Sequence, residues 1–268
     1  MSRSSIFLSD VSREWKPVSQ PGLINQMRAV AYREYRTRSS VGASSYLWVV
    51  LAPIAWIVVV IAAFEVLDRR IPLSTDVLTF VLSGVIPYMV FRFAVTGVIR
   101  ARSGYRHVIR FLGVSPRIIF ATVGVVELSN LCIVMSALVV LNWAVLGNAV
   151  DMNLPAVMSG LTLAAGLGVA FAALAVALDG PREGYTRAVP IILRPSFYLS
   201  AVFYIPEELP SSMAQIVAYN PLTHCVGLIR QGLVQDYQSL AASGLFVLGV
   251  TGVMGIMTWV RLERSALL

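Results

Sequence analysis

Six long apolar runs, separated by short polar segments, limit most strongly what this chain can fold into. The runs cover residues 46–64, 77–99, 118–146, 154–178, 188–204 and 240–260. A helix needs about 20 mostly apolar residues to cross a bilayer, so each run is a candidate transmembrane helix. Only 13% of the residues are charged, against about a quarter in a soluble domain, and a surface so poor in charge must face lipid. We therefore expect an all-α integral membrane protein with six transmembrane helices.

The segment before the first run has two parts. Residues 1–20 lack the apolar core of a signal peptide, so we expect a cytoplasmic extension ahead of one transmembrane domain over residues 21–268. Residues 21–40 place apolar side chains on one helical face and arginines on the others. This pattern predicts an amphipathic helix in the membrane interface, although an ordinary surface helix would share it.

The segment between the last two runs, residues 205–239, is too long for a turn and too apolar for a solvated loop. Pro206, Pro210 and Pro221 divide it, so we expect several short helices. Two arrangements remain open. The short helices dip into the membrane and return, with their backbone buried in protein, or they form a hairpin outside the bilayer.

The basic residues predict the orientation. Sixteen Lys and Arg residues fall before the first run, in the loop 100–117, between the fourth and fifth runs and after the sixth. The opposite side has three Arg residues and seven acidic ones. Because basic residues concentrate on the cytoplasmic side of membrane proteins, we expect both termini to be cytoplasmic.

Three charged residues lie inside the runs: Arg92, Glu127 and Arg194. Each costs roughly 2.5–3.5 kcal/mol at the centre of a membrane, so each needs a partner or a water-filled path. Glu127 could neutralise one of the two arginines within a packed bundle. Alternatively, the arginines line a conduit for anionic groups of a substrate, and Arg194 suits this because Pro190 and Pro195 interrupt its helix.

Aromatic residues gather in the second run and at the end of the fifth. They are Tyr88, Phe91 and Phe93, then Phe197, Tyr198, Phe203 and Tyr204. Aromatic belts at the membrane surface explain such residues. A conduit for sugars would also use them, because aromatic rings stack on the apolar faces of sugar rings. Periodicity does not separate these two interpretations.

The loop 100–117 combines arginines with a compact apolar patch. Its candidate contact residues are Arg100, Arg102, Tyr105, Arg106, Val108, Ile109, Arg110, Phe111 and Leu112. A loop that only obeys the positive-inside rule needs no such patch, whereas a short helix that docks into a groove on a cytoplasmic partner does. We expect partner docking here.

Several classes of function are excluded by missing motifs. The single lysine, Lys16, is followed by proline, so the chain has no phosphate-binding loop of the G-x-x-x-x-G-K-[ST] type. It also lacks the HExxH and GxSxG motifs of hydrolases, and its two Cys and two His show no metal-ligand spacing. We expect a non-enzymatic chain that binds no metal, no cofactor and no nucleic acid, and any nucleotide hydrolysis must occur on another polypeptide.

Several stretches, in this order, resemble the ABC-2 type permeases, in particular the capsular polysaccharide exporters of Gram-negative bacteria. The stretches are YREYRTR (32–38), YLWVVLAP (46–53), LSGVIPYMVF (82–91), the basic loop 100–117, VPIILRP (189–195) with FYLSAVFY (197–204), and YNPLTHCVGLIR (219–230). The last two are the more specific. The resemblance covers nearly the whole chain from about residue 21.

The resemblance implies a half-transporter in the bacterial inner membrane. Two copies would pair around a conduit, two subunits that bind ATP and Mg²⁺ would dock beneath, and a lipid-linked polysaccharide would move outward. A periplasmic adaptor or co-polymerase and an outer-membrane polysaccharide pore would continue the path. Arg33, Arg36 and the loop 100–117 would couple ATP hydrolysis to the spans.

The resemblance also implies an external gate. The gate would comprise Pro206, Tyr219, Asn220, Pro221, His224 and Arg230. Arg194 and His224 fall on positions of the family motifs, whereas Arg92 lies just past a matching stretch and is a local inference.

Alternatives remain within and outside this family. An exporter of O-antigen or teichoic acid, or a lipid or drug permease of the same superfamily, would share the composition. An ion-coupled secondary transporter would need paired acids within the membrane, and Glu127 is the only such acid in the six runs.

Overall fold

The computed structural model describes residues 22–39, 43–68, 71–105, 116–146, 152–179, 184–234 and 236–266, and these residues form helices and their connections without a strand. The helices are α2 (Leu23–Ser39), α3 (Ala43–Val66), α4 (Val77–Gly104), α6 (Pro116–Leu146), α7 (Leu154–Leu178), α8 (Gly184–Leu199), the 3-10 helix η1 (Pro206–Glu208), α9 (Ser211–Ala218), α10 (Pro221–Leu233) and α11 (Gly244–Ala266). The predicted extension 1–20 lies outside the described residues.

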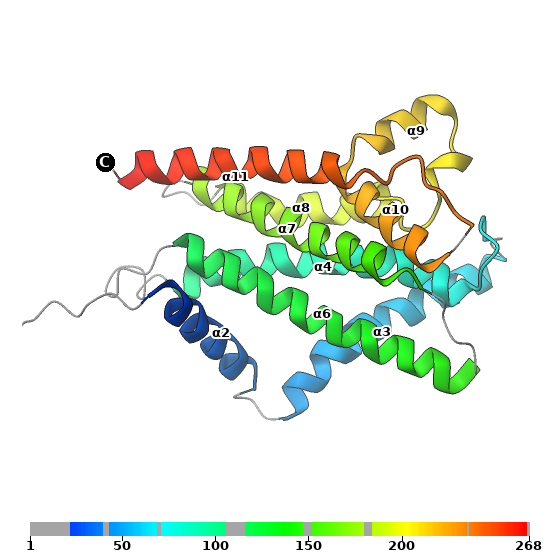
Figure 1. Ribbon diagram of the computed structural model, residues 1–268, viewed down its shortest axis with the longest axis horizontal. Coiled ribbons are helices and arrows are strands. Elements are labelled where there is room, and N and C mark those ends of the chain that lie inside the picture. The colour runs from blue at the N-terminus through cyan, green and yellow to red at the C-terminus, as the bar shows by residue number, and fades with distance from the viewer. Residues whose placement is uncertain are drawn as a thin grey trace, which may run out of the picture.

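Helix α7 is the centre of the bundle. It packs against α4, α6, α10 and α11, and these contacts bury much of its surface. Figure 1 shows α11, α7 and α4 running roughly along the long axis, α6 and α3 inclined to it, and α2 placed obliquely at one end. Helices α9 and α10 lie at the opposite end, whereas the last turn of α11 lies at the same end of the bundle as α2. Segments that begin and end the described chain therefore share one end of the bundle.

Each of the six apolar runs contains a helix. Helix α7 has the predicted bounds, 154–178, and α3, α4, α6 and α11 begin or end within a few residues of theirs. In the described part of the chain, three helices are long and apolar enough to cross a membrane: Val77–Arg102, Leu154–Leu178 and Gly244–Leu262. The described residues thus form the all-helical bundle of a membrane protein, and the number of crossings stays a prediction.

The prolines of the fifth run do not interrupt their helix, contrary to expectation. Helix α8 continues through both Pro190 and Pro195, and α4 in the same way continues through Pro87. Neighbouring helices and local adjustment can satisfy the backbone groups that a proline frees in a membrane helix. Helix α8 instead ends at Leu199, where the predicted run continues to 204, and Ala201 then adopts a left-handed backbone with φ 56°.

Two glycines of α7 allow neighbouring helices to approach closely. A Cβ at Gly160 would meet the Ile229 side chain and the Cys225 carbonyl of α10, and one at Gly168 would meet the Phe91 carbonyl of α4. The glycine-rich sequence of this run predicts such contacts, because small residues let membrane helices pack backbone to backbone.

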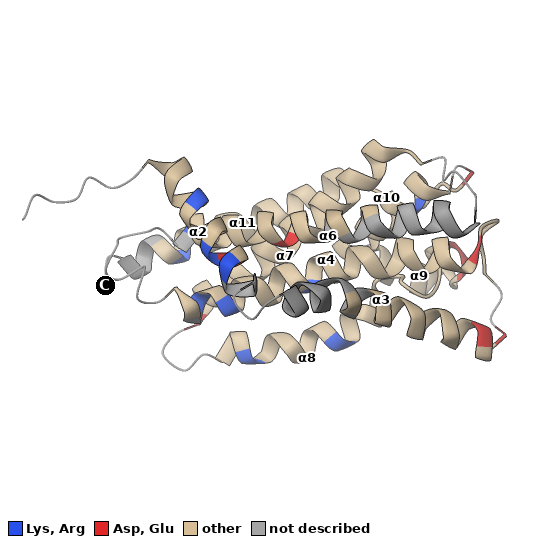
Figure 2. Ribbon diagram, turned by 90° about the horizontal axis from the view of Figure 1, so that it is seen from below, with Lys and Arg blue, Asp and Glu red and all other residues tan. Residues whose placement is uncertain are grey.

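The charges separate along the bundle. In Figure 2, Lys and Arg gather at the end formed by α2 and the last turns of α11, and Asp and Glu gather mainly at the opposite end. This separation agrees with the arginine distribution from which the orientation is predicted.

The segment after α8 forms the short helices that its prolines predict. Helix α10 is buried and packs against α4, α7 and α11, whereas most of α9 is exposed. The end of the bundle therefore contains both a buried and a peripheral short helix. The depth of either helix in a membrane stays a prediction.

Candidate functional site

A hollow of about 710 Å³ opens between α3, α4 and α8. Its lining residues are Trp56, Tyr88, Met89, Arg92, Thr96, Ile99, Arg100, Thr186, Val189, Pro190, Leu193, Arg194, Phe197 and Tyr198. The lining contains three arginines and no acidic residue. It is therefore suited to hold an anionic group against an otherwise apolar and aromatic wall.

The spacing of apolar residues on α8 determines which side chains reach this arginine hollow. Thr186, Val189, Leu193 and Phe197 recur every three or four residues and are buried. The residues that follow two of them are Arg194 and Tyr198, so they fall at the edge of the packed face and are exposed. Helix α8 thus packs on its neighbours through one row of buried side chains and leaves Arg194 accessible.

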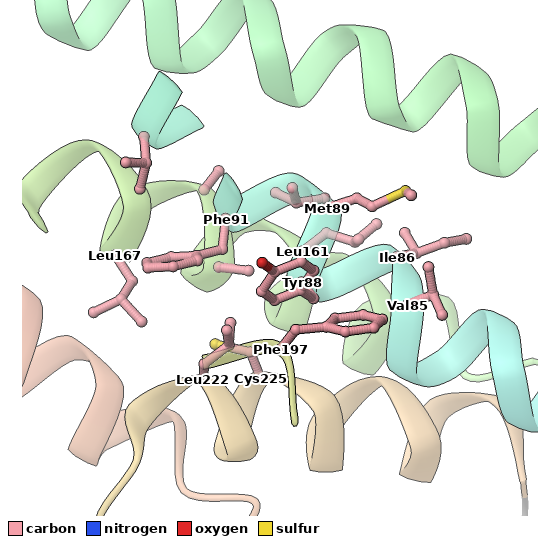
Figure 3. Packing of buried hydrophobic residues seen from close by; sticks show 14 of the residues in the cluster. Val85, Ile86, Tyr88, Met89, Phe91, Leu161, Leu167, Phe197, Leu222 and Cys225 are labelled. Carbon is pink, nitrogen blue, oxygen red and sulfur yellow. The ribbon is translucent and has the colours of Figure 1, made fainter. Parts of the chain in front are cut away.

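Aromatic contacts connect α8 to α3 and α4. The Tyr88 hydroxyl donates a hydrogen bond of 2.7 Å to the carbonyl of Leu193. The rings of Tyr88 and Phe197 lie 4.6 Å apart between centroids, and Trp56 packs edge-on against Phe197 at 5.8 Å. Figure 3 shows Tyr88 and Phe197 side by side. These contacts hold the wall of the hollow in place.

A second hollow of about 350 Å³ continues the aromatic surface. It is lined by Ala63, Phe64, Leu67, Tyr198, Phe203 and Tyr204. Tyr198 borders both hollows, and its ring stacks on Phe203 with centroids 5.7 Å apart. The two hollows thus form a path along α3 and α8 that begins with arginines and continues with aromatic rings.

Seven of the eight predicted conduit residues border these hollows. They are Arg92, Arg194, Tyr88, Phe197, Tyr198, Phe203 and Tyr204. Phe91 does not, because it points to the other side of α4 and packs against Phe171 of α7, with ring centroids 6.0 Å apart. Phe91 directly precedes Arg92, so their side chains point about 100° apart around α4, and Phe91 falls outside the face that lines the hollow.

The buried acid has a partner that the sequence did not indicate. The carboxylate of Glu127 lies 3.4 Å from the guanidinium of Arg100, and neither Arg92 nor Arg194 neutralises it by an ion pair in the described structure. Arg100 also lies 3.9 Å from Glu34 of α2. Glu127 pairs with Arg100 and not with Arg92 because Arg100 lies two turns further along α4, at the same height in the bundle as Glu127 on α6. Arg100 therefore connects α2, α4 and α6.

The two predicted coupling residues of α2, Arg33 and Arg36, differ in their contacts. The Arg33 guanidinium donates a 2.9 Å hydrogen bond to the carbonyl of Gly104 and stacks on the Tyr105 ring at 4.3 Å. Arg36 is exposed and interacts with Tyr32 on its own helix. Arg33 thus connects α2 to the end of α4, where the loop 100–117 begins.

Residues 106–115 of that loop lie beyond the residues that the structure describes. Arg106, Val108, Ile109, Arg110, Phe111 and Leu112 are in the undescribed part. Their docking role stays a prediction.

Asp179 is a residue whose role the sequence analysis did not identify. Its side chain is inaccessible to solvent and accepts hydrogen bonds from Arg102 on α4, from the Thr186 hydroxyl and from the Tyr185 amide on α8. Burial favours the neutral acid, but these hydrogen bonds outweigh it and lower the pKa of Asp179. An acid at the end of a helix opposes the helix dipole, and this was the signal that Asp179 serves another element.

Arg230, a predicted gate residue, is buried and has three polar partners. Its guanidinium donates to the carbonyls of Tyr204 at 2.7 Å and Val202 at 3.0 Å, and to the Ser83 hydroxyl at 3.3 Å. It also lies over the Phe80 ring, 4.4 Å from the centroid. Arg230 therefore fixes the segment after α8 between α10 and α4.

His224 and Asn220 connect the short helices. The Nδ1 atom of His224 accepts a 3.0 Å hydrogen bond from the Ser243 amide, and Nε2 lies 2.8 Å from the Ala218 carbonyl, to which it donates. Asn220 caps α10 by accepting from the Leu222 amide at 3.0 Å. Both polar side chains therefore hold α10 in position.

The other three predicted gate residues lie around these helices. Pro206 begins η1, Pro221 begins α10, and Tyr219 is exposed between α9 and α10. A movement that opens a gate here would have to break the contacts of Arg230 and His224.

Comparison with known proteins gives two relatives. Two Escherichia coli proteins, each named Polysialic acid transport protein KpsM, align over 263 residues with 26% and 25% identity. Each alignment covers 90% of this chain and 95% of the relative. No family model matches the chain.

Proposed function

We propose that this chain is the permease subunit of an ATP-driven exporter that moves lipid-linked capsular polysaccharide from the cytoplasm to the periplasm. The observation that carries the proposal is the path of two hollows along α3, α4 and α8. It combines Arg92 and Arg194 with aromatic rings and contains no acid in its lining. The two transport proteins that align with nearly the whole chain support the same class of substrate.

The chemistry of the path suits a charged lipid joined to a long sugar chain. The arginines attract the anionic group at the lipid-linked end, in a cavity whose other walls are apolar. Rings such as Tyr198 and Phe203 then offer stacking surfaces to sugars. Contacts of this kind are weak and repeated, and they let a polymer slide without being held at one position.

A second copy of the chain would close the path. Helix α8 also exposes apolar residues outside the lining of the hollow, among them Ile191 and Ile192. Helix α3 exposes Val58 and Val59, which are close in sequence to Trp56. An exposed apolar surface of this kind suits another helix or lipid. Two protomers that meet through α3 and α8 would convert two open hollows into one enclosed conduit.

Energy would come from two ATP-binding subunits on the arginine-rich end. They would dock on the loop 100–117, whose first residues connect to α2 through Arg33 and to α8 through Arg102 and Asp179. A displacement of the loop would then reach α8, which forms one wall of the hollow. A periplasmic adaptor and an outer-membrane pore would receive the polymer.

Export by variants tests the conduit. The chromosomal gene is replaced by Arg194→Gln or Tyr198→Ala, and polysaccharide is measured on the cell surface and inside the cell. We expect surface polysaccharide to fall and internal polysaccharide to accumulate. Arg187→Gln and Tyr185→Ala are matched controls, because both residues lie on α8 and outside the hollow. Normal export by the Arg194 and Tyr198 variants would refute the conduit.

Copurification tests the energy source. The full chain, extracted in mild detergent, should bring down an ATP-binding subunit in about equal amount, because each protomer docks one. A chain that transports alone in vesicles, driven by an ion gradient, would identify an ion-coupled transporter instead.

A further inference from the structure

A separate apolar groove of about 430 Å³ runs between α6, α7 and α11. Helices α6 and α11 each pack against α7, which forms the floor of the groove. Its lining residues are Arg117, Phe120, Ala121, Gly124, Val125, Leu128, Thr162, Ala165, Gly166, Val169, Ala170, Ala173, Thr251, Gly255, Thr258 and Leu262. It shares no lining residue with the two hollows along α3 and α8.

Small residues create the space. Glycine and alanine provide much of the floor and both walls, and a Cβ at Gly255 would meet no atom within 4 Å. The outward face of α11 around the groove is apolar and exposed, with Ile256 67% accessible. An apolar groove on an outward face of a membrane helix bundle opens to the hydrocarbon chains of lipids.

The length of the groove matches one leaflet. Its α6 wall extends from Arg117 to Leu128, and eleven residues of helix span about 16 Å. Half of the hydrocarbon core of a bilayer is about 15 Å thick. The groove therefore accommodates an acyl chain from the membrane surface to the midplane.

A cation lies at one end of the groove. Arg117 is in the second position of α6, a helix that packs against α2 and begins at the end of the bundle where α2 lies (Figure 1). Its guanidinium lies 3.3 Å from the centroid of the Trp259 ring on α11. Tryptophan prefers the level of lipid headgroups, and arginine binds phosphate oxygens through its planar donors. The polar end and the apolar length of the groove thus match the two parts of one phospholipid.

We infer that this groove binds an anionic glycerophospholipid of the leaflet at the arginine-rich end. One acyl chain occupies the space between α6 and α11, and the headgroup phosphate lies beside Arg117. A lipid in this position fills the gap between two helices that meet mainly through α7. The groove is distinct from the proposed conduit, so a test of lipid binding here does not depend on which substrate is transported.

Native mass spectrometry of the full chain tests the site. The chain is released from nanodiscs that contain equal parts of phosphatidylglycerol and phosphatidylcholine, and retained lipid is identified. We expect the wild-type chain to retain one phosphatidylglycerol per copy in preference to phosphatidylcholine. Gly255→Leu fills the groove and should lower this retention about tenfold, equivalent to 1.4 kcal/mol of binding. Gly252→Leu is the matched control, because Gly252 also has open space but lies outside the groove.

Variants that change the charge at Arg117 test whether this residue binds the lipid headgroup. Arg117→Gln should remove the preference for phosphatidylglycerol, whereas Arg117→Lys and Arg261→Gln should keep it, since Arg261 does not line the groove. Melting temperature and monodispersity establish that each variant is folded. Equal retention of the two lipids by the wild type, or equal retention by Gly255→Leu and Gly252→Leu, would overturn the inference. A copurified protein that Gly255→Leu releases, with no bound lipid, would do so as well.

Discussion

Asp179, which follows the last turn of α7, accepts a hydrogen bond from the guanidinium of Arg102 at the end of α4. The same carboxylate accepts from Thr186 and from the Tyr185 amide, so it also caps the first turn of α8. One side chain thereby connects three helices at the end where the loop 100–117 begins. The other main packing partners of α8 are only the helices α7 and α4, so few contacts besides those of Asp179 hold it in place.

Asp179→Asn should therefore destabilise the chain. The asparagine side chain has no negative charge to attract Arg102. It also has one acceptor oxygen, whereas both carboxylate oxygens of Asp179 accept hydrogen bonds. Loss of charged hydrogen bonds in a buried position costs about 1–3 kcal/mol. A thermal melt of the purified chain measures the loss, and Asp236→Asn is the control because Asp236 is exposed. An unchanged melting temperature would contradict the role of Asp179.

The contribution of Asp179 should depend on pH. Its folded-state pKa is lowered, so the charged form stabilises the fold above the unfolded-state pKa of about 3.9. This stabilisation is lost as the pH falls through the lowered pKa. Melts between pH 7 and pH 3 should show a constant difference between wild type and Asp179→Asn above about pH 5. The difference should shrink toward pH 3. A difference that grows there would mean that the folded-state pKa of Asp179 is raised, not lowered.

Arg230→Lys should be destabilising although it keeps the charge. A lysine ammonium cannot reproduce the planar set of donors that reaches Tyr204, Val202 and Ser83. Each buried carbonyl left without a donor costs about 1–3 kcal/mol. Melting temperature again measures the effect, and Arg187→Lys on the exposed face of α8 should change it little. Equal stability of the two variants would show that Arg230 does not fix the segment after α8.

The helices could be predicted because their signal is local. Helix α7 has the bounds of its apolar run, since Asn153 caps its start and the charged residue Asp179 follows its end. The prediction that prolines interrupt a helix was wrong for α8. The free-energy cost of a proline inside a helix depends on whether neighbouring groups satisfy the carbonyls that it leaves without a hydrogen bond. A sequence does not show those neighbours, and α4 and α8 continue through theirs.

The candidate site could be predicted in part. Tyr88, Arg92 and Arg194 were identified by their residue types, and the structure places all three in one hollow. The partners of the charges could not be predicted, because they depend on how α4, α6 and α10 are rotated and aligned. That Glu127 meets Arg100, and that Arg230 is buried under the segment after α8, follow from tertiary packing alone.

Two glycines of α7 should respond differently to the same substitution. At Gly168 a Cβ would meet the Phe91 carbonyl at 2.6 Å and the Ala94 Cβ at 2.9 Å, so Gly168→Ala must push α4 away. At Gly166 the nearest atom, in Thr251, is 4.0 Å away, so Gly166→Ala should be neutral or slightly stabilising through its better helix propensity. The expected cost at Gly168 is about 1–3 kcal/mol, as for other overpacked sites. Melting temperatures of the two variants give the comparison, and similar values would contradict the close contact of α4 and α7.

The pair formed by Arg100 and Glu127 should show a coupling energy in a double-mutant cycle. Glu127 is the buried member, with a side chain 8% accessible, whereas the Arg100 side chain is 61% accessible. Removing Arg100 leaves a buried carboxylate with one cation fewer, so Arg100→Gln should cost more than Glu127→Gln. The double variant should recover part of the loss, because the buried carboxylate that lost the Arg100 cation is gone as well.

The coupling should lie near the lower end of the usual 0.5–3 kcal/mol, about 1 kcal/mol, because solvent screens the exposed guanidinium. Unfolding free energies of the four chains in mixed micelles give this value. The same cycle with Glu34, which lies 3.9 Å from Arg100 rather than 3.4 Å, is the control and should give less. Additive effects for Arg100 and Glu127 would mean that the pair does not join α4 to α6. If the larger coupling instead belongs to Glu34, Arg100 connects α4 chiefly to the helix α2 at the end of the bundle.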